Sequence, residues 1–177
     1  MVTKTAAVLV LILVATIAAI GCSQGNSGAL ATPSPTSGGN TGGTVGVVRP
    51  TWIDAQISGN TVSVPKIEVD SGKMLHFKVA GQGAQMAFMA YKLGEETYVR
   101  ANLCVPCQSQ SFSLAGDVLD CNTCHTKFEA RTGKGITGPC RNYPKAEVAY
   151  AISDGKITMG MDDLLTAYEN TQKPGWP

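Results

Sequence analysis

The chain has 177 residues, six cysteines, two histidines and a formal net charge of +1. This length has room for one modest domain rather than several. The charge is balanced, and no run of Lys or Arg gives the basic stripe that a nucleic-acid binder needs. We therefore expect no nucleic-acid partner.

The first 21 residues are typical of an export signal. One cation, Lys4, precedes an uncharged apolar stretch of about 16 residues, shorter than the ~20 that a membrane-spanning helix needs. The segment ends in Ala19-Ile20-Gly21-Cys22, which resembles the bacterial lipobox, although Leu is usual in place of Ala19. The resemblance implies lipidation of Cys22, cleavage just before it, and a lipid anchor in the cell membrane with the chain on the extracytoplasmic face. An uncleaved anchor and ordinary secretion are the alternatives.

Residues 22–44 are a predicted disordered tether. Of the 22 residues from Ser23 to Thr44, 18 are Gly, Ser, Thr, Pro or Asn, and none is charged. Such a composition cannot bury enough apolar surface to order itself. We therefore expect residues 45–177 to form the folded, β-rich, metal-binding domain.

The first half of this domain has the pattern of half-buried strands. Apolar residues alternate with others in residues 61–69, 73–80 and 85–92, and a further short run covers 98–101. Pro65 interrupts the first run, which predicts an edge strand or two short pieces.

The end of the chain predicts a hairpin and a helix. Residues 147–152 and 156–159 flank Asp154-Gly155, which is typical of a tight turn. Apolar residues then recur at helical spacing from Met161 to Tyr168, and Pro174 forbids much extension beyond Thr171. We predict a mostly β fold, a small β-sandwich with two cysteine knuckles and a C-terminal helix.

Two C-x2-C pairs, separated by 13 residues, are the most informative feature of the sequence. Two such turns that face each other can supply four thiolates to one tetrahedral centre. The predicted metal ligands are Cys104, Cys107, Cys121 and Cys124. Cys140 is a further candidate, which could replace one ligand, cap the site by a disulfide or simply be buried. The spacing of the cysteines does not distinguish an iron-sulfur cluster from a single Fe or Zn ion or from disulfides. If Cys22 carries a lipid, however, five thiols remain, and an odd number cannot all pair within the chain.

A c-type haem is one alternative. Cys121-Asn-Thr-Cys124-His125 matches the attachment motif C-x-x-C-H, in which the histidine is the axial ligand. Met86 or Met89 would then be the distal ligand, but the first cysteine pair stays unexplained. Without haem, His125 is predicted to donate a hydrogen bond beside the ligands.

A thiol-disulfide oxidoreductase is the second alternative, with Cys104 and Cys107 cycling between dithiol and disulfide. Such an enzyme would place this pair at a helix N-terminus, whereas strand and loop signals surround it here. Five methionines and His76 could suggest Cu(I), but their interleaving with phenylalanines favours a core position. Motifs of hydrolases and of dinucleotide binding are absent, so the sequence leaves open whether the chain is an enzyme.

The run from Val118 to Ile157 resembles the second half of a Rieske domain. The matching residues include Leu119-Asp-Cys121, Cys124, Phe128, Thr132-Gly133, Gly138-Pro139, Tyr143-Pro144 and Asp154-Gly155-Lys156-Ile157. A Rieske centre uses C-x-H and C-x2-H, whereas Cys107 and Cys124 stand where histidines are expected. The resemblance implies two metal-bearing loops on a Rieske-like β scaffold.

The longer stretch from about Trp52 to Gly175 resembles the FtrD-like family of membrane-associated iron-sulfur proteins, encoded near ferrous-iron uptake permeases. The matching residues are Arg100, both cysteine pairs, Phe128, Cys140 and Tyr143-Pro144-Lys145-Ala146. This resemblance implies an extracytoplasmic electron-transfer module that acts in iron uptake, with an iron permease or a redox protein as its partner.

Overall fold

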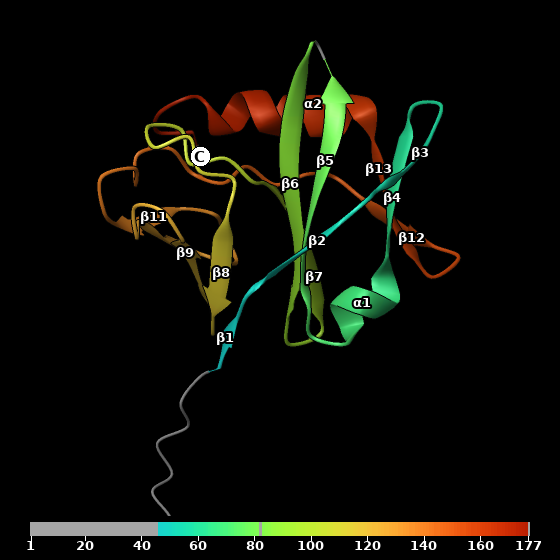
Figure 1. The fold of residues 1–177 in the computed structure, drawn as a ribbon, viewed down its shortest axis with the longest axis horizontal. Coiled ribbons are helices and arrows are strands. Elements are labelled where there is room, and N and C mark those ends of the chain that lie inside the picture. Colours follow the sequence, from blue (N-terminus) through green and yellow to red (C-terminus); the bar gives the residue numbers. More distant parts are fainter. Residues whose placement is uncertain (1–45, 82, 177) are drawn as a thin grey trace, which may run out of the picture. The chain divides into compact units, whose positions relative to one another are not determined.

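Strands dominate the part of the chain that the structure, a computed structural model, describes, namely residues 46–81 and 83–176 (Figure 1). The central sheet has the order β2-β5-β6-β7, with β2 Pro50–Ile53, β5 Met74–Gly81, β6 Ala84–Leu93 and β7 Glu96–Ala101. Strand β2 runs parallel to β5, and the other neighbours in this sheet are antiparallel. The predicted leader, Cys22 and the tether lie outside the described residues.

Two further sheets contain the remaining strands, and all their neighbours are antiparallel. The hairpin sheet has the order β12-β13-β4-β3, with β12 Ala151–Ser153, β13 Lys156–Gly160, β4 Thr61–Pro65 and β3 Gln56–Ser58. The cysteine sheet has the order β1-β8-β9-β10-β11, with β1 Val47–Val48, β8 Phe112–Ala115, β9 Val118–Cys121, β10 Lys127–Glu129 and β11 Gly135–Thr137. The helices are α1 Lys66–Asp70 and α2 Met161–Thr171. Within the described ranges, neither helix is long and apolar enough to cross a membrane.

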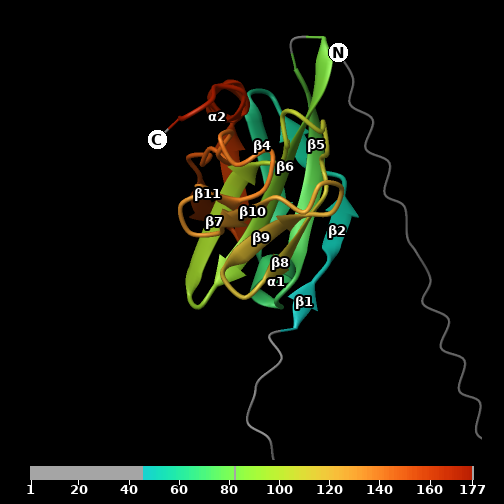
Figure 2. The same ribbon diagram turned by 90° about the vertical axis from the view of Figure 1, so that its left-hand side faces the viewer.

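The central sheet is covered on both faces, as Figures 1 and 2 show. In β5, Leu75 and Phe77 belong to a core that also contains side chains of the hairpin sheet and α2. Met74 in β5 and Met89 in β6 belong instead to a core shared with the cysteine sheet. Because successive side chains of a strand point to opposite faces, one alternating sequence can supply two cores.

Most of the predicted elements are confirmed. Residues 73–80 and 85–92 correspond to β5 and β6, and 98–101 fall within β7. The hairpin around Asp154-Gly155 is present as β12 and β13, and the C-terminal helix ends at Thr171, as predicted. The first arm of the hairpin is shorter than the predicted 147–152, because β12 begins only at Ala151 and Glu147 forms an isolated bridge with Arg100. The prediction of a mostly β fold with a terminal helix is therefore confirmed. The described residues contain three sheets, one more than the two sheets of a β-sandwich.

The strand predicted for residues 61–69 is correct only as far as Pro65. This proline ends β4, which pairs on both sides and is not an edge strand. Residues 66–70 then form α1, with Ile67 exposed and Val69 buried on opposite sides of the short helix. The alternation of Ile67 and Val69 was therefore not a strand signal here. Pro65 has no N–H to donate to a sheet ladder, so the strand ends at this residue, which is also the N-cap of the helix that follows.

Four of the five methionines in the described residues are buried in the cores, as the sequence favoured, and Met161 packs partly buried against one core. Met86 and Met159 are buried with the hairpin sheet, whereas Met74 and Met89 are buried with the cysteine sheet. They are thus divided between two cores and do not form one copper-binding cluster.

A buried histidine lies on the face of the central sheet that carries the cysteine sheet. His76 is fully buried, and its ring meets that of Trp52 edge-on at 5.1 Å between centroids. Asn102 Nδ2 donates a hydrogen bond to His76 Nδ1 at 3.1 Å. Burial lowers the pKa of His76 to about 3, so the imidazole is neutral at pH 7.

We expect this histidine to make stability depend on pH. In the unfolded chain a histidine titrates near its ordinary pKa of 6.5, whereas folded His76 takes up a proton only near pH 3. The unfolded state therefore binds more protons between these values. The free energy of unfolding should be fully retained above pH 6.5 and should fall by about 1.4 kcal/mol per pH unit below it.

Urea unfolding between pH 7 and pH 5 tests this expectation. His76→Gln should remove this component of the pH dependence, whereas His125→Gln, at an exposed position, should retain it. The same pH dependence in wild type and His76→Gln would show that the expectation is wrong.

Candidate metal centre

The two cysteine pairs lie in tight loops of the same construction. The first loop follows β7, and its Cys104 N–H donates to Ser109 O at 2.8 Å. The second loop follows β9, and its Cys121 N–H donates to Thr126 O at 3.0 Å. In both loops the bond joins the first cysteine to the residue five positions later. Each pair of sulfurs is thereby placed on one closed turn.

His125 occupies a backbone position that the first loop gives to Gln108. Both residues follow the second cysteine of a pair, and both have a left-handed backbone, with φ 58° at Gln108 and 55° at His125. Histidine is among the residues enriched in this region. The His125 side chain is 77% exposed, with Nδ1 3.4 Å from Asp120 Oδ1. The C-x-x-C-H pattern therefore has an explanation in the loop backbone, and the haem alternative gains no support.

The four predicted sulfurs converge. Those of Cys104, Cys107, Cys121 and Cys124 all lie within 4.8 Å of one another. The short contacts cross from loop to loop, with Cys104 Sγ 3.7 Å from Cys124 Sγ and Cys107 Sγ 3.8 Å from Cys121 Sγ. These separations are far longer than an S–S bond of about 2.05 Å. The cysteines that the structure describes are all free thiols, in contrast to the disulfide alternative.

A fifth sulfur lies beside the four. Cys140 is buried, and its Sγ is 3.7 Å from that of Cys124. The Thr126 hydroxyl links the two, because its Oγ1 lies 3.1 Å from Cys124 Sγ and accepts the Cys140 N–H at 3.2 Å. Gly138 permits this approach: its φ is +108°, and a Cβ there would lie 2.6 Å from Thr126 Cα. The structure therefore brings all five predicted cysteines together.

Polar side chains tie the two loops to each other. Asn122 Nδ2 donates to Ser111 Oγ at 2.8 Å, and Ser113 Oγ donates to Asn122 Oδ1 at 2.7 Å. Thr123 Oγ1 donates to Ser109 Oγ at 2.9 Å. These bonds hold the loops face to face, so the sulfurs meet without a covalent link.

The thiols share protons unevenly. The contact with Cys104 lowers the pKa of Cys121 to about 4, and backbone N–H groups of Thr123 and Cys124 lower it further against the effect of burial. The same contact, together with burial, raises the pKa of Cys104. The thiolate form is thus favoured at Cys121 and disfavoured at Cys104. A cation that prefers thiolate ligands would balance several such charges at once, so this donor set fits an iron-sulfur centre or a tetrahedral metal ion.

Arg100 joins the central sheet to the segments around the cysteine centre. The sequence indicated Arg100 only as a residue that matches the family, and no pattern predicted that its side chain would link these segments. It is 1% exposed, and its Nε donates to Tyr91 Oη at 3.1 Å and to Ala130 O at 3.2 Å. Its Nη1 donates to Lys145 O at 3.0 Å, and Nη2 lies 3.3 Å from Glu147 Oε2. Three segments distant in sequence are therefore fixed by one guanidinium.

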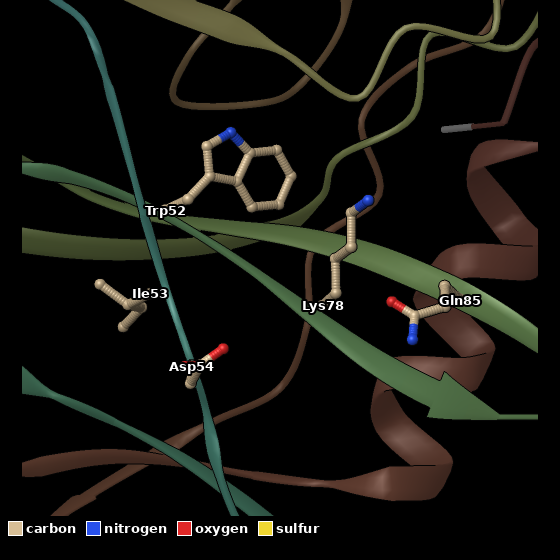
Figure 3. A pocket seen from close by; sticks show the side chains of 5 residues that line it. All are labelled: Trp52, Ile53, Asp54, Lys78 and Gln85. Atoms are coloured by element: carbon tan, nitrogen blue, oxygen red, sulfur yellow. The ribbon is translucent and has the colours of Figure 1, made fainter.

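Five surface hollows are lined by residues outside the cysteine loops. One hollow has a volume of about 350 Å³. Figure 3 shows the side chains that line it, those of Trp52, Ile53, Asp54, Lys78 and Gln85. None of the five hollows described contains a cysteine in its lining. The four-sulfur centre is therefore separate from these hollows.

Comparisons with solved structures found similarities to ferredoxins and their complexes. A chain of the complex of reduced oxygenase and oxidized ferredoxin in carbazole 1,9a-dioxygenase is 20% identical, with 59% of this chain and 95% of that chain covered and a TM-score of 0.48. The Sphingomonas yanoikuyae B1 ferredoxin is 21% identical, with 54% and 92% covered and a TM-score of 0.45. The ferredoxin of carbazole 1,9a-dioxygenase from Nocardioides aromaticivorans IC177 is 20% identical, with 55% and 96% covered and a TM-score of 0.42.

Sequence comparison was more specific. No curated protein matches this chain significantly. Residues 69–170 match the family model described as membrane iron-sulfur containing protein FtrD-like. This range includes both cysteine loops, Cys140 and Arg100, and it covers more than half of the chain. The chain therefore belongs to the FtrD-like family of membrane iron-sulfur proteins.

Proposed function

We propose that the chain is an iron-sulfur electron-transfer module whose iron is held by four cysteine thiolates. The observation that carries this proposal is the convergence of four free thiols, from two facing loops, within 4.8 Å. Thiolate sulfur is the usual ligand of iron-sulfur centres, and membership of an iron-sulfur family supports iron over zinc. The proposed ligands are Cys104, Cys107, Cys121 and Cys124.

The bound iron would supply one-electron exchange, and the chain would supply position and electrostatics. Thr126 Oγ1, at 3.1 Å from Cys124 Sγ, can donate a hydrogen bond that stabilises negative charge on this sulfur. Cys104 and Cys121 are buried, whereas Cys107 and Cys124 are partly exposed. We therefore place the approach of a redox partner on the side of Cys107 and Cys124.

Cys140 is proposed to be a reserve ligand. Its sulfur is 3.7 Å from Cys124, which is one of the two partly exposed ligands. A buried thiol at this distance could replace Cys124 after a small rotation of its side chain. His125 is proposed to have no direct bond to the centre, because its side chain is 77% exposed and contacts Asp120.

We further propose that the module is held at the extracytoplasmic face of the cell membrane by a lipid on Cys22. The apolar stretch before Gly21-Cys22 supports an export signal, and the family description supports membrane association. The resemblance to proteins encoded near ferrous-iron permeases supports electron transfer during iron uptake, with such a permease or a redox protein as partner.

The full-length protein, extracted anaerobically from membranes, is the test of this function. We expect bound iron, acid-labile sulfide and an EPR signal after reduction with dithionite. Four thiolates favour the oxidised centre, so the midpoint potential should be on the order of −400 mV. A colourless, metal-free product with bridged thiols would contradict the proposal and favour a thiol-disulfide oxidoreductase.

Single Cys→Ser variants test the ligand set. Cys104→Ser and Cys121→Ser should lose most of the bound iron, because a hydroxyl is a poor substitute for a buried thiolate ligand. Cys140→Ser is the matched control and should retain iron, since it removes a buried thiol of the same cluster that is not a ligand. Iron and sulfide content, with the visible spectrum, measure the difference. Equal losses in all three variants would refute the separation of Cys140 from the ligands.

Cys22→Ser tests the anchor. We expect the wild-type chain in the membrane fraction, with an acyl mass on Cys22, and the variant without this mass and depleted from washed membranes. Quantitative immunoblotting of the fractions and mass spectrometry provide the measurement. A variant that stays with the membranes as wild type does would show that the lipid does not anchor the chain.

A further inference from the structure

Lys145 is a fully buried lysine that faces the core of the cysteine sheet. Its Nζ donates a hydrogen bond to the carbonyl oxygen of Leu103, the residue directly before Cys104. The ammonium lies 4.6 Å from the ring centroid of Phe128 and 5.7 Å from that of Phe112. Both rings belong to the buried cluster that contains Cys104, Cys121 and Cys140. The positive charge is therefore held inside the same core as the sulfurs.

The backbone of Lys145 is fixed from two sides. Its N–H donates to Gly133 O at 2.8 Å, and its carbonyl accepts from Arg100 Nη1 at 3.0 Å. Gly133 has a φ of +75°, and a Cβ at this position would lie 2.1 Å from Lys145 O. The close approach thus requires glycine, and it prevents the lysine from moving outward as a whole.

Among the described residues, no carboxylate forms an ion pair with this lysine. The ion pairs found in the described part of the chain do not include Lys145, and the nearby Glu147 pairs with Arg100. Lys66, Lys73 and Lys92, in contrast, pair with carboxylates at the surface. A buried ammonium without an anionic partner is strongly unfavourable.

The cysteine sulfurs are the negative groups that can balance it. Burial lowers the pKa of Lys145 to about 8, and the charges of Cys104, Cys121, Cys140 and Cys107 oppose this decrease. The two aromatic faces and the Leu103 carbonyl add attraction for a cation, but neither carries a full negative charge. A metal centre with four thiolates would be anionic and would compensate the ammonium.

We propose that Lys145 is the buried counter-charge of the four-cysteine centre and that it raises both the metal affinity and the reduction potential of this centre. This inference rests on the proposed function and adds the residue that tunes it. An added electron makes an anionic centre more negative, so a fixed cation in a region of low dielectric stabilises the reduced state more than the oxidised state. Lys145 is thus a tuning residue that acts through charge without binding the metal.

Lys145→Met tests the proposal, with Lys127→Met as the matched control. Both variants remove one ammonium, but Lys127 is exposed on β10, directly before Phe128, where water screens its charge. We expect Lys145→Met to shift the midpoint potential to a more negative value. Its affinity for Zn²⁺, measured by competition with a chelator, should fall about ten- to hundredfold, whereas Lys127→Met should match wild type.

Two further measurements cover the case in which Lys145→Met does not fold. Lys145→Arg keeps the charge and should keep Zn²⁺ affinity closer to wild type. The ¹⁵N chemical shift of Lys145 Nζ in the zinc-loaded wild-type chain should be that of an ammonium at pH 7. A neutral amine there, or equal potentials and Zn²⁺ affinities in Lys145→Met and Lys127→Met, would overturn the proposal.

The outcomes also separate this inference from the proposed function. A wild-type chain that binds neither iron nor Zn²⁺ would refute the proposed function, and the counter-charge with it. If the wild-type chain binds iron, but Lys145→Met has the same midpoint potential and the same Zn²⁺ affinity, the counter-charge alone is refuted.

Discussion

The close approach of five cysteine sulfurs, three of them buried and two partly exposed, is the constraint on which the rest of this structure depends. Thiolates that lie within 4.8 Å of one another repel, and burial makes each charge more unfavourable. The fold nevertheless holds them together without a disulfide, through loop hydrogen bonds such as that of Thr123 with Ser109. The arrangement is electrostatically reasonable once a cation joins the sulfurs and a fixed positive charge, that of Lys145, lies in the same core.

The central sheet makes such a core possible because it has two buried faces. One face packs against the hairpin sheet and α2 in an ordinary apolar core, which includes Phe77 and Phe88. The other packs against the cysteine sheet (Figure 2). Buried polar groups on this side include His76 of β5 and Lys145, which follows β11 and contacts Phe112 and Phe128. The apolar core on one face therefore stabilises the fold, whereas the proposed metal centre lies on the side of the other face. Arg100 in β7 links the central sheet to the segments around the cysteine centre, since its bonds reach Ala130 and Lys145.

Local sequence patterns predicted the elements whose formation is decided locally. Strands β5 and β6 show clear alternation and have glycines at their common turn, and α2 has an uninterrupted helical period. The pattern was misleading at residues 66–70, where the constraint from Pro65 outweighed two alternating apolar residues. Strand β2 was missed because its partner β5 is parallel and separated from it by the hairpin β3–β4 and α1. The pairing of distant segments leaves no local signal.

The sequence by itself identified the candidate donors, because two C-x2-C turns can supply four thiolates to one centre wherever the chain places them. Only the tertiary structure decided which sulfurs meet, that Cys140 lies 3.7 Å from Cys124, and that His125 faces water. The same holds for the burial of Lys145, which no local pattern in the sequence indicates. The reason is physical: loop spacing constrains atoms within one turn, whereas burial and charge balance arise from packing between sheets that are distant in the chain.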